Sequence, residues 1–391
     1  MKLEEKAMSQ EFSMTNFFRE AKELFKVSSA LAIMSLAAPV LAGSMSMTEQ
    51  AKQIVKEASA PLSNGADARA IYVGQKLAGR SIFYISAGLS FEFSQEVLKG
   101  VEDASNKLGM RIITADAPDS SQASASIDRA ISRHASAIVL QGIDPYTVQA
   151  AITDAKKAGI PVVSTAAIPA GPIPKNIADA GLSANVNISI VDTGKITAAY
   201  IAANGRPDAQ VALISCSTFE SDSVFAKEFT KELKRLCPEC QVIQKDSPLP
   251  QWQTTLPSLV RTLVTVNPKM SYVVASVDSM VPSIKPAIIA VGAGDRIKIV
   301  SSNASLPDMQ AIALKTDTEV ANLGASNERM GWATVDQVAR LLIGQPAIDN
   351  VEPQRLFTID NIGTVNLTKP AATWYGFDFQ SYYLKLWGLK S

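Results

Sequence analysis

Residues 136–165 read SAIVLQGIDPYTVQAAITDAKKAGIPVVST. Two short runs rich in Val, Ile and Leu flank a segment that repeats apolar residues at helical spacing. Strands that are apolar along their whole length are typical of a parallel sheet covered by helices on both faces. This stretch therefore predicts a strand over 136–140, a helix over 145–157 and a strand over 160–165.

The same alternation continues on both sides of this unit. Upstream, strands over 81–85 and 110–114 are each followed by a helical pattern, over 93–108 and 122–133. A less regular stretch, 166–188, separates this series from a second one. The second series predicts helices over 189–203, 221–236, 253–266, 279–291, 307–313 and 327–343 and strands over 210–215, 241–246, 271–275, 297–301 and 319–323. We expect an α/β fold of two doubly wound halves, with ligands bound beyond the carboxyl ends of the strands.

Composition narrows the classes of function. The 391 residues are 47% hydrophobic and 19% charged, which suits about two folded domains. The 37 basic and 37 acidic side chains cancel, so the positive charge of a nucleic-acid-binding protein is missing. One histidine, His134, and three cysteines leave little for a zinc site or a histidine-based triad. Phosphate-loop, dinucleotide and nucleophile-elbow motifs are also absent, so we expect no enzyme, metal or cofactor.

The N-terminal region is typical of an export signal. Residues 27–42, VSSALAIMSLAAPVLA, carry no charge and follow Arg19, Lys22 and Lys26. The run is short for a membrane span and ends in small residues, which predicts cleavage near Ala42. A buried helix is the alternative. We expect a signal peptide over 1–42, an extension over 43–79 and a periplasmic location.

The cysteines invite three interpretations. Cys237-Pro238-Glu239-Cys240 closes one predicted helix and precedes a strand. In an oxidising compartment the two cysteines can form a short structural disulfide. Free thiols are the second possibility, and a redox motif is the third. The redox motif is disfavoured because the pair follows a helix, whereas a helix start is what lowers a thiol pKa.

Several stretches resemble a known family. They are RSIFYIS (80–86), FSQEVLKGVEDASNKLGMRI (93–112), AIVLQGIDPYTVQAAITDAKKAGIPVVS (137–164), YVVASVDSM (272–280), IKIVSSNASLPDMQAI (297–312) and VDQVARLLIGQP (335–346). In order and spacing they resemble the type I periplasmic binding proteins, in the ribose-binding-like branch that delivers substrates to ABC importers. Repressors of the LacI type share this body, but they carry a helix-turn-helix where this chain carries the apolar run.

The resemblance implies two lobes joined by three chain crossings, with a small-molecule ligand between them. The N-lobe would hold 80–184 and 326–347, and the C-lobe would hold 185–325 with the tail 348–391. The lobes would close around the ligand by hinge motion, and the partner would be an ABC permease in the inner membrane. A monomer is the expectation from the family.

The chain departs from the sugar-binding pattern of this branch. Where sugar binders carry an Asp-Arg pair after the fourth strand, this chain has Ala166-Ala167. An expected Arg falls at about Ser223, an Asn at Val277 and an Asp at Asn303. Sugars need several charged or bidentate partners to replace the water they lose. We therefore expect a hydroxyl-poor ligand, aromatic or alicyclic.

Aromatic residues stand where the resemblance puts ligand contacts. Phe91 and Phe93 follow the first strand, and Trp252 follows the strand over 241–246. Their faces offer contact area without requiring hydroxyl partners. Core packing is the competing role for Phe93, because it opens an amphipathic helix.

The polar candidates are fewer, and each has a competing structural role. Asn303 could bond one ligand oxygen or stabilise a turn, and Asp278 could contact the ligand or cap the helix that follows. Ser217, Thr218 and Ser223 lie near the first turn of a helix, where free amides could hold an oxygen.

Three functions remain open at this stage. The first is a solute-binding protein of an ABC importer. The second is a sensor that presents the closed form to a membrane receptor kinase or chemoreceptor, and the third is a sugar binder with an atypical site.

Overall fold

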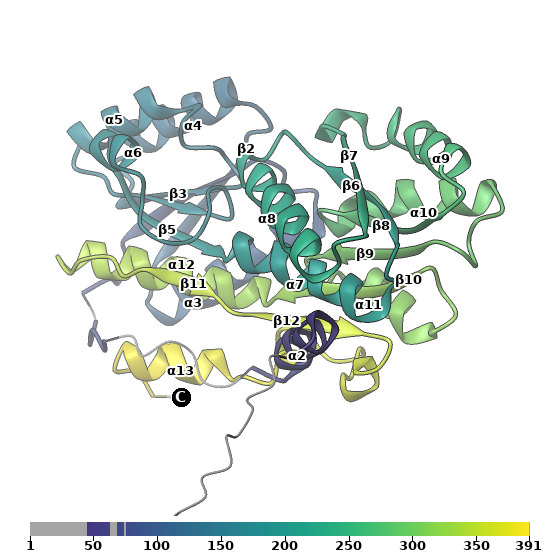
Figure 1. Ribbon diagram of the computed structural model, residues 1–391. Helices are drawn as coiled ribbons and strands as arrows, with labels where there is room; N and C mark the ends of the chain where they lie inside the picture. The colour runs from purple at the N-terminus through teal and green to yellow at the C-terminus, as the bar shows by residue number, and fades with distance from the viewer. Residues whose placement is uncertain (1–44, 63–68, 74–75, 391) are drawn as a thin grey trace, which may run out of the picture. The chain divides into compact units, whose positions relative to one another are not determined.

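The structure, a computed structural model, describes residues 45–62, 69–73 and 76–390 (Figure 1). The predicted signal peptide over 1–42 lies outside these residues. None of the helices within them combines the length and apolar character needed to cross a bilayer.

The first of two sheets is parallel throughout. Its strands are β1 (Ser81–Ser86), β2 (Arg111–Asp116), β3 (Ala137–Gln141), β4 (Val162–Thr165), β5 (Leu182–Ile188) and β11 (Asn350–Glu352), in the order β11-β5-β4-β3-β1-β2. Helices α3 (Glu92–Lys107), α4 (Ser120–Ser132), α5 (Gln149–Lys157), α6 (Lys175–Ala180), α12 (Asn327–Leu342) and α13 (Phe379–Leu386) accompany it. We call this part the first lobe.

The second sheet has the same plan with one antiparallel edge. Its strands are β6 (Gln210–Ser215), β7 (Gln241–Asp246), β8 (Met270–Ala275), β9 (Lys298–Ser302), β10 (Glu319–Ala325) and β12 (Gln354–Thr358), in the order β12-β10-β9-β8-β6-β7, with β12 antiparallel to β10. Helices α2 (Met47–Ser59), α7 (Ile190–Asn204), α8 (Glu220–Leu236), α9 (Leu256–Val266), α10 (Val281–Ala290) and α11 (Leu306–Leu314) accompany it. This part is the second lobe.

Each central strand is buried on both faces because successive side chains point to opposite sides of the sheet. In β1, Ile82 and Tyr84 join one hydrophobic cluster, with α3 and α12, while Phe83 and Ile85 join the other, with α4 and α5. This is the physical reason that the strands are apolar along their length, as the sequence pattern required.

Three segments connect the lobes. The chain passes from β5 to α7, returns from β10 to α12, and passes again from β11 to β12. The two-lobed α/β fold with a three-crossing hinge, predicted from the sequence, is confirmed. Helix α12 packs against α3 at two glycines: a Cβ on Gly100 would lie 2.1 Å from the carbonyl oxygen of Glu328, and one on Gly331 would lie 2.4 Å from that of Val97.

Some elements differ from the sequence-based expectations. The stretch 166–188, expected to be irregular, contains α6 and the whole of β5. Helix α5 begins at Gln149, because the residues after Pro145 form a turn. The lobe boundaries stay a prediction, although β5 extends the first sheet to Ile188, beyond the expected limit at 184.

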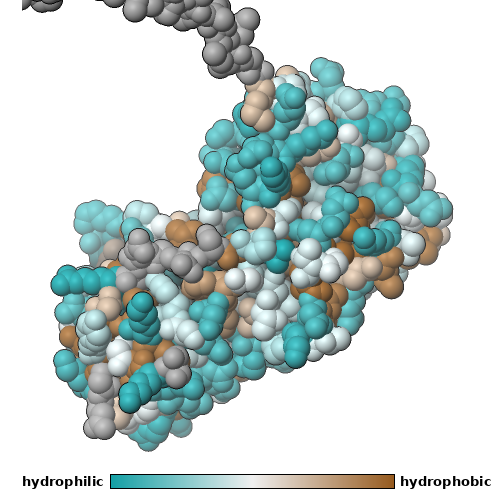
Figure 2. Space-filling model, turned by 90° about the horizontal axis from the view of Figure 1, so that it is seen from below, coloured by the Kyte–Doolittle hydropathy of each residue, from teal (hydrophilic) through white to brown (hydrophobic). Residues whose placement is uncertain are grey.

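The extension and the tail pack beside each other. Helix α2 lies on α7 and β12 of the second lobe, whereas the backbone N–H groups of Ile71 and Val73 donate to the carbonyls of Leu386 and Trp387 (Figure 1). The tail, expected with the second lobe, is divided: β12 joins the second sheet, and α13 packs in the core of the first lobe. The face seen in Figure 2 is mostly hydrophilic, with scattered apolar residues.

Candidate functional site

A cavity of about 150 Å³ lies where strands of both sheets end. Its lining comes from the residues at or after the ends of β1, β3, β4 and β5 in the first lobe and of β7, β8, β9 and β10 in the second. The first turns of α3, α7, α8 and α12 complete it. The carboxyl ends of parallel strands are the expected ligand position in open α/β sheets. Its volume is that of a cavity that holds a benzene-sized ligand.

Three aromatic residues predicted from the sequence line this cavity. Phe91 is 36% exposed, and its ring lies so close to Gly88 that a Cβ there would be 2.6 Å from it. Phe93 lines the cavity and also packs on the core of the first lobe. Its position therefore suits both ligand contact and core packing. Trp252 is 6% exposed, and its indole N–H donates to the carbonyl of Ser247 at 2.9 Å.

Two further aromatic rings of the second lobe complete the lining. Phe219 immediately precedes α8 and Phe225 lies in its second turn. The sequence pattern does not single them out, because Phe225 has the spacing of an ordinary core residue on an amphipathic helix. Rings from both lobes therefore surround the cavity, with Phe91 and Phe93 on one side and Phe219, Phe225 and Trp252 on the other.

Many polar side chains of the lining are already engaged by the protein. The side-chain amide of Asn187 donates to the carbonyl of Ile168 and accepts from the N–H of Ile188, both at 2.8 Å. Asn327 donates to Glu96 at 2.8 Å, and burial raises the pKa of that carboxyl group. Gln141 accepts from the hydroxyl of Ser86 at 2.5 Å. Such groups hold the loops in place and have little capacity left for ligand hydroxyls.

Asn303 is the polar candidate that the structure places in the cavity. Within the described part of the chain its backbone N–H donates to Leu323, and no hydrogen bond involves its side-chain amide. Its φ is +100°, and Ala166, also in the lining, has a φ of +56°. Non-glycine residues in this region are uncommon and cluster at ligand sites, so the strained turns at the ends of β9 and β4 support a binding role.

The other polar candidates do not belong to this lining. Ser217 donates through its N–H and its hydroxyl to Asp246, at 2.8 and 2.7 Å, and Thr218 accepts from the N–H of Leu249 at 3.0 Å. Ser223 is also absent from the lining, whereas Ser221 of the same turn belongs to it. These contacts turn the first two side chains toward β7 and the loop after it.

Asp278 has a structural position instead of a place in the cavity. It is 3% exposed and accepts from the backbone N–H of Ser305 at 2.8 Å, which ties the end of β8 to the loop after β9. It is not the N-cap of α10 either, because that position is held by Met280.

Asp222 was not selected from the sequence, yet it is the one ionisable side chain among the described residues of the lining. It lies in the first turn of α8 and is 7% exposed. Its carboxylate accepts from the backbone N–H of Cys216. Burial raises its pKa to about 6. Its place in the sequence, shortly after a strand and at the start of a helix, is the feature that could have identified it as a site residue.

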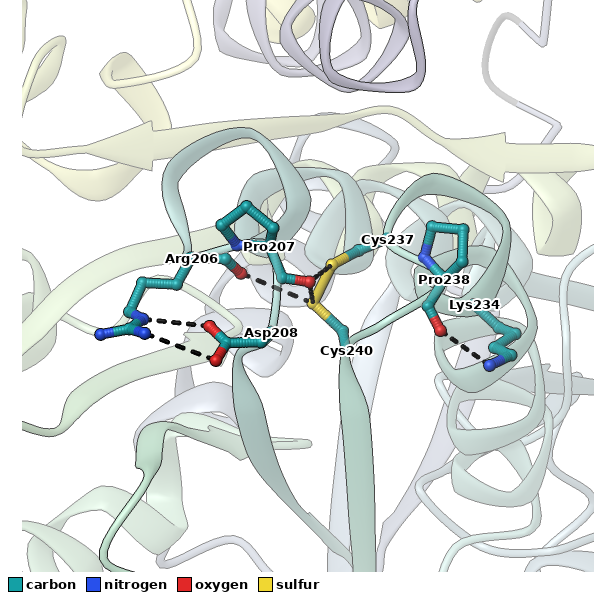
Figure 3. The surroundings of a disulfide bond; sticks show 7 residues. All are labelled: Arg206, Pro207, Asp208, Lys234, Cys237, Pro238 and Cys240. Carbon is teal, nitrogen blue, oxygen red and sulfur yellow. Dashed lines mark hydrogen bonds and ion pairs between the residues drawn. A yellow bond between two sulfur atoms is a disulfide. The ribbon is translucent and has the colours of Figure 1, made fainter.

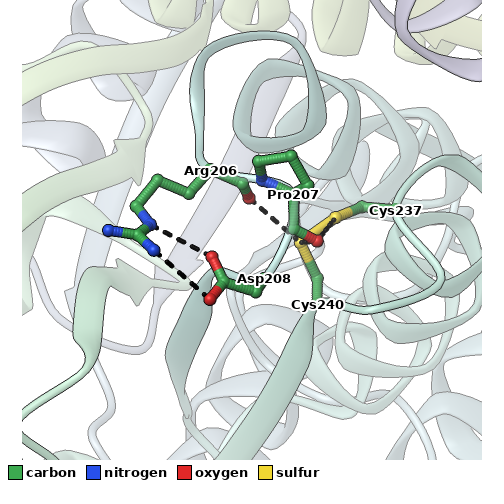
Figure 4. Close-up of polar contacts among 5 residues, drawn as sticks. All are labelled: Arg206, Pro207, Asp208, Cys237 and Cys240. Carbon is green, nitrogen blue, oxygen red and sulfur yellow. Dashed lines mark hydrogen bonds and ion pairs between the residues drawn. A yellow bond between two sulfur atoms is a disulfide. The ribbon is translucent and has the colours of Figure 1, made fainter.

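Cys237 and Cys240 form a disulfide at the end of α8 (Figure 3), and neither residue belongs to the cavity lining. The Cys237 sulfur lies 3.1 Å from the carbonyl oxygen of Pro207, in the loop before β6. Figure 4 shows the same loop with the ion pair between Arg206 and Asp208, at 3.0 Å. The bond therefore joins the end of α8 to the start of β7 beside this loop, which is a structural position. No cluster of possible metal ligands occurs among the described residues.

Comparisons with known proteins agree with the two-lobed fold. The family model described as periplasmic binding protein domain matches residues 82–346. A solute-binding protein of an ABC transporter from Agrobacterium vitis with bound allitol is 17% identical, with a TM-score of 0.66 over 74% of this chain and 98% of that one. A 5-methylthioribose transporter solute-binding protein from Thermotoga lettingae is also 17% identical, with a TM-score of 0.66 over 82% of this chain and 95% of that one.

A third structure extends the range of bound ligands. A solute-binding protein from Bacillus halodurans with bound myo-inositol is 18% identical, with a TM-score of 0.64 over 73% of this chain and 97% of that one. At such identities the likeness concerns the fold. No curated protein sequence matches the chain.

Proposed function

The chain belongs to the periplasmic binding protein domain family, and on that premise we propose that it captures a small hydroxyl-poor ligand, aromatic or alicyclic, for an ABC importer. The cavity between the lobes carries this proposal. Five aromatic rings line it, and so does Ala166, at the position where the resemblance to sugar binders would put a charged pair. An apolar body gains from burial against these rings, whereas a sugar has more hydroxyl groups than Asn303 and Asp222 can pair.

Closure follows from the distribution of the contacts. Phe91 and Phe93 belong to the first lobe and Trp252 to the second, so a ligand touches both sets only when the lobes come together. A ligand shifts a conformational equilibrium by its differential affinity for the two states. We therefore propose that the closed form is the ligand-bound form presented to the permease.

The proposal includes export and a monomeric state. The apolar run over 27–42 would direct the chain to the periplasm, and cleavage would follow near Ala42. N-terminal sequencing of the protein from a periplasmic extract tests the cleavage, and light scattering of the purified protein tests the monomer.

Ligand identity is tested first by native mass spectrometry of the purified protein, because closure slows ligand escape. A thermal-shift series with allitol, myo-inositol, cyclohexanol and 2-phenylethanol then compares hydroxyl-rich with hydroxyl-poor compounds. We expect stabilisation by the last two. A strong response to the polyols alone would overturn the proposed ligand class and leave solute binding intact.

A further inference from the structure

The charge of the cavity lining is unbalanced. Among its described residues no Lys, Arg or His occurs, and Asp222 alone is ionisable. An anionic ligand would therefore be buried beside a carboxylate with no positive side chain in contact with it. Burial of an unpaired charge is strongly unfavourable, and a like charge nearby adds to the cost.

Asp222 retains capacity for a ligand. Its carboxylate accepts from the N–H of Cys216. An ionised carboxylate offers about four acceptor positions. Since Asp222 lines the cavity, we infer that a donor entering the cavity can reach the remaining positions. With a pKa of about 6 the group is mostly charged at pH 7.

Asp222 has an aromatic residue on either side of it in the sequence of α8 and its N-cap. Phe219 and Phe225 are three residues before and after Asp222, and all three line the cavity together with Trp252. Residues three apart on a helix share a face. Aromatic faces attract cations, and the attraction is stronger where water is excluded. A carboxylate among aromatic rings therefore suits an organic ammonium group.

We propose that the ligand of this cavity carries a protonated amine that pairs with the Asp222 carboxylate, and that the cavity discriminates against carboxylates. This inference rests on the proposed solute-binding function and adds a charge requirement to it. The alternative is that Asp222 serves only to hold the N–H of Cys216, in which case ligand charge would not depend on it.

The test uses two pairs of ligands. The two members of each pair share a similar carbon skeleton and differ in the sign of their charge. The probes are 2-phenylethylamine and phenylacetate, and glucosamine and glucuronate, each measured by isothermal titration calorimetry at pH 7. We expect each amine to bind at least about tenfold more tightly than its carboxylate partner, since charged hydrogen bonds contribute more than one factor of ten. Asp222→Asn keeps the shape and should remove this preference.

Two controls separate the pairing from a structural role. Asp295→Asn is the matched variant, because Asp295 is an exposed carboxylate of the second lobe outside the cavity lining. It should leave the preference unchanged. If Asp222→Asn fails to fold, the wild type itself carries the test: below pH 6 the affinity for the amine should fall as Asp222 is protonated.

The outcomes distinguish this inference from the proposed function. Equal or tighter binding of phenylacetate than of 2-phenylethylamine overturns the charge requirement and leaves the hydroxyl-poor ligand class standing. Tighter binding of glucosamine than of glucuronate, with no binding of either phenyl compound, supports the charge requirement and overturns that ligand class. An amine preference that survives Asp222→Asn contradicts the pairing, and absence of binding by all four probes contradicts both proposals.

Discussion

The indole rings of Trp332 and Trp387 stack with 5.4 Å between their centroids and 2° between their planes. Trp332 belongs to α12 beside the hinge, and Trp387 follows α13 close to the end of the chain. The indole N–H of Trp387 donates to Asp336 at 2.8 Å, and Phe379 and Tyr383 also pack on Trp332. The aromatic tail is therefore part of the core of the first lobe.

Removal of the Trp387 indole ring should destabilise the protein. Trp387→Ala leaves a cavity in a fully buried aromatic cluster, for which we expect a loss of about 3–5 kcal/mol of unfolding free energy. Urea denaturation followed by circular dichroism measures it. Lys385→Ala on the exposed side of α13 is the control and should stay within about 0.5 kcal/mol of the wild type. Equal midpoints for the two variants would show that the tail does not stabilise the lobe.

Two aromatic residues of the cavity should separate affinity from stability. Phe91→Ala should weaken binding of the tightest thermal-shift ligand by roughly tenfold with little change in stability, because Phe91 is partly exposed. Trp252→Ala should lower both, with about 3–5 kcal/mol lost from folding, because Trp252 also packs in the second lobe.

Calorimetric titration and urea denaturation of the same preparations check this separation. Leu314→Ala, an exposed apolar residue outside the cavity lining, should change neither quantity. Unaltered affinity in both aromatic variants would place the ligand elsewhere.

The disulfide should contribute a modest, measurable stability. A bond between Cys237 and Cys240 closes a very short loop, for which the loss of chain entropy gives about 2 kcal/mol. Dithiothreitol should therefore lower the urea midpoint of the wild type and leave that of a Cys237→Ser/Cys240→Ser double variant unchanged. Cys216→Ser, at the free buried cysteine, should respond to dithiothreitol as the wild type does. A reductant effect on the double variant would contradict the assignment.

Three buried acids of the second lobe give a pH dependence. Asp278, Asp308 and Glu319 lie together with Ser301 and Ser305, and burial raises the pKa of each carboxyl group, that of Asp278 to about 8. A raised pKa means that the folded state holds its proton where the unfolded state has lost it. The stability from this proton is complete below the unfolded pKa near 4 and is lost as the pH rises to 8.

Asp278→Asn isolates this effect because the amide stays neutral. Relative to the wild type, the variant should become progressively more stable between pH 4 and about 8, with a constant difference above that range. Melting temperatures across this range measure it, and Asp295→Asn, in the exposed turn before β9, is the control. A difference that does not vary with pH would mean that Asp278 titrates normally.

The sequence by itself determined the succession of strands and helices. Continuous apolar runs such as 137–140 and 160–163 indicate strands that are buried on both faces. They can be recognised from the residues of the strand alone. Strand β5 was not predicted from the sequence, because Asn185 and Asn187 interrupt its apolar pattern. Both are buried nonetheless, since their amides donate to the carbonyls of Ile168 and Pro169 in another segment.

The same division holds for the candidate site. Sequence order placed Phe91, Trp252 and Asn303 after strands, and parallel strands bring their carboxyl ends to one edge of each sheet. The cavity is lined from both of these edges. Sequence order does not predict which of the residues around the start of α8 line the cavity.

Only the tertiary structure decided which of those residues enter the cavity. Ser217 turns toward Asp246 of β7, and the N–H of Cys216 holds Asp222 in the lining. The direction of a side chain at a helix start depends on the rotation of the helix against the sheet. That rotation is set by contacts between segments far apart in the chain, which no local pattern encodes.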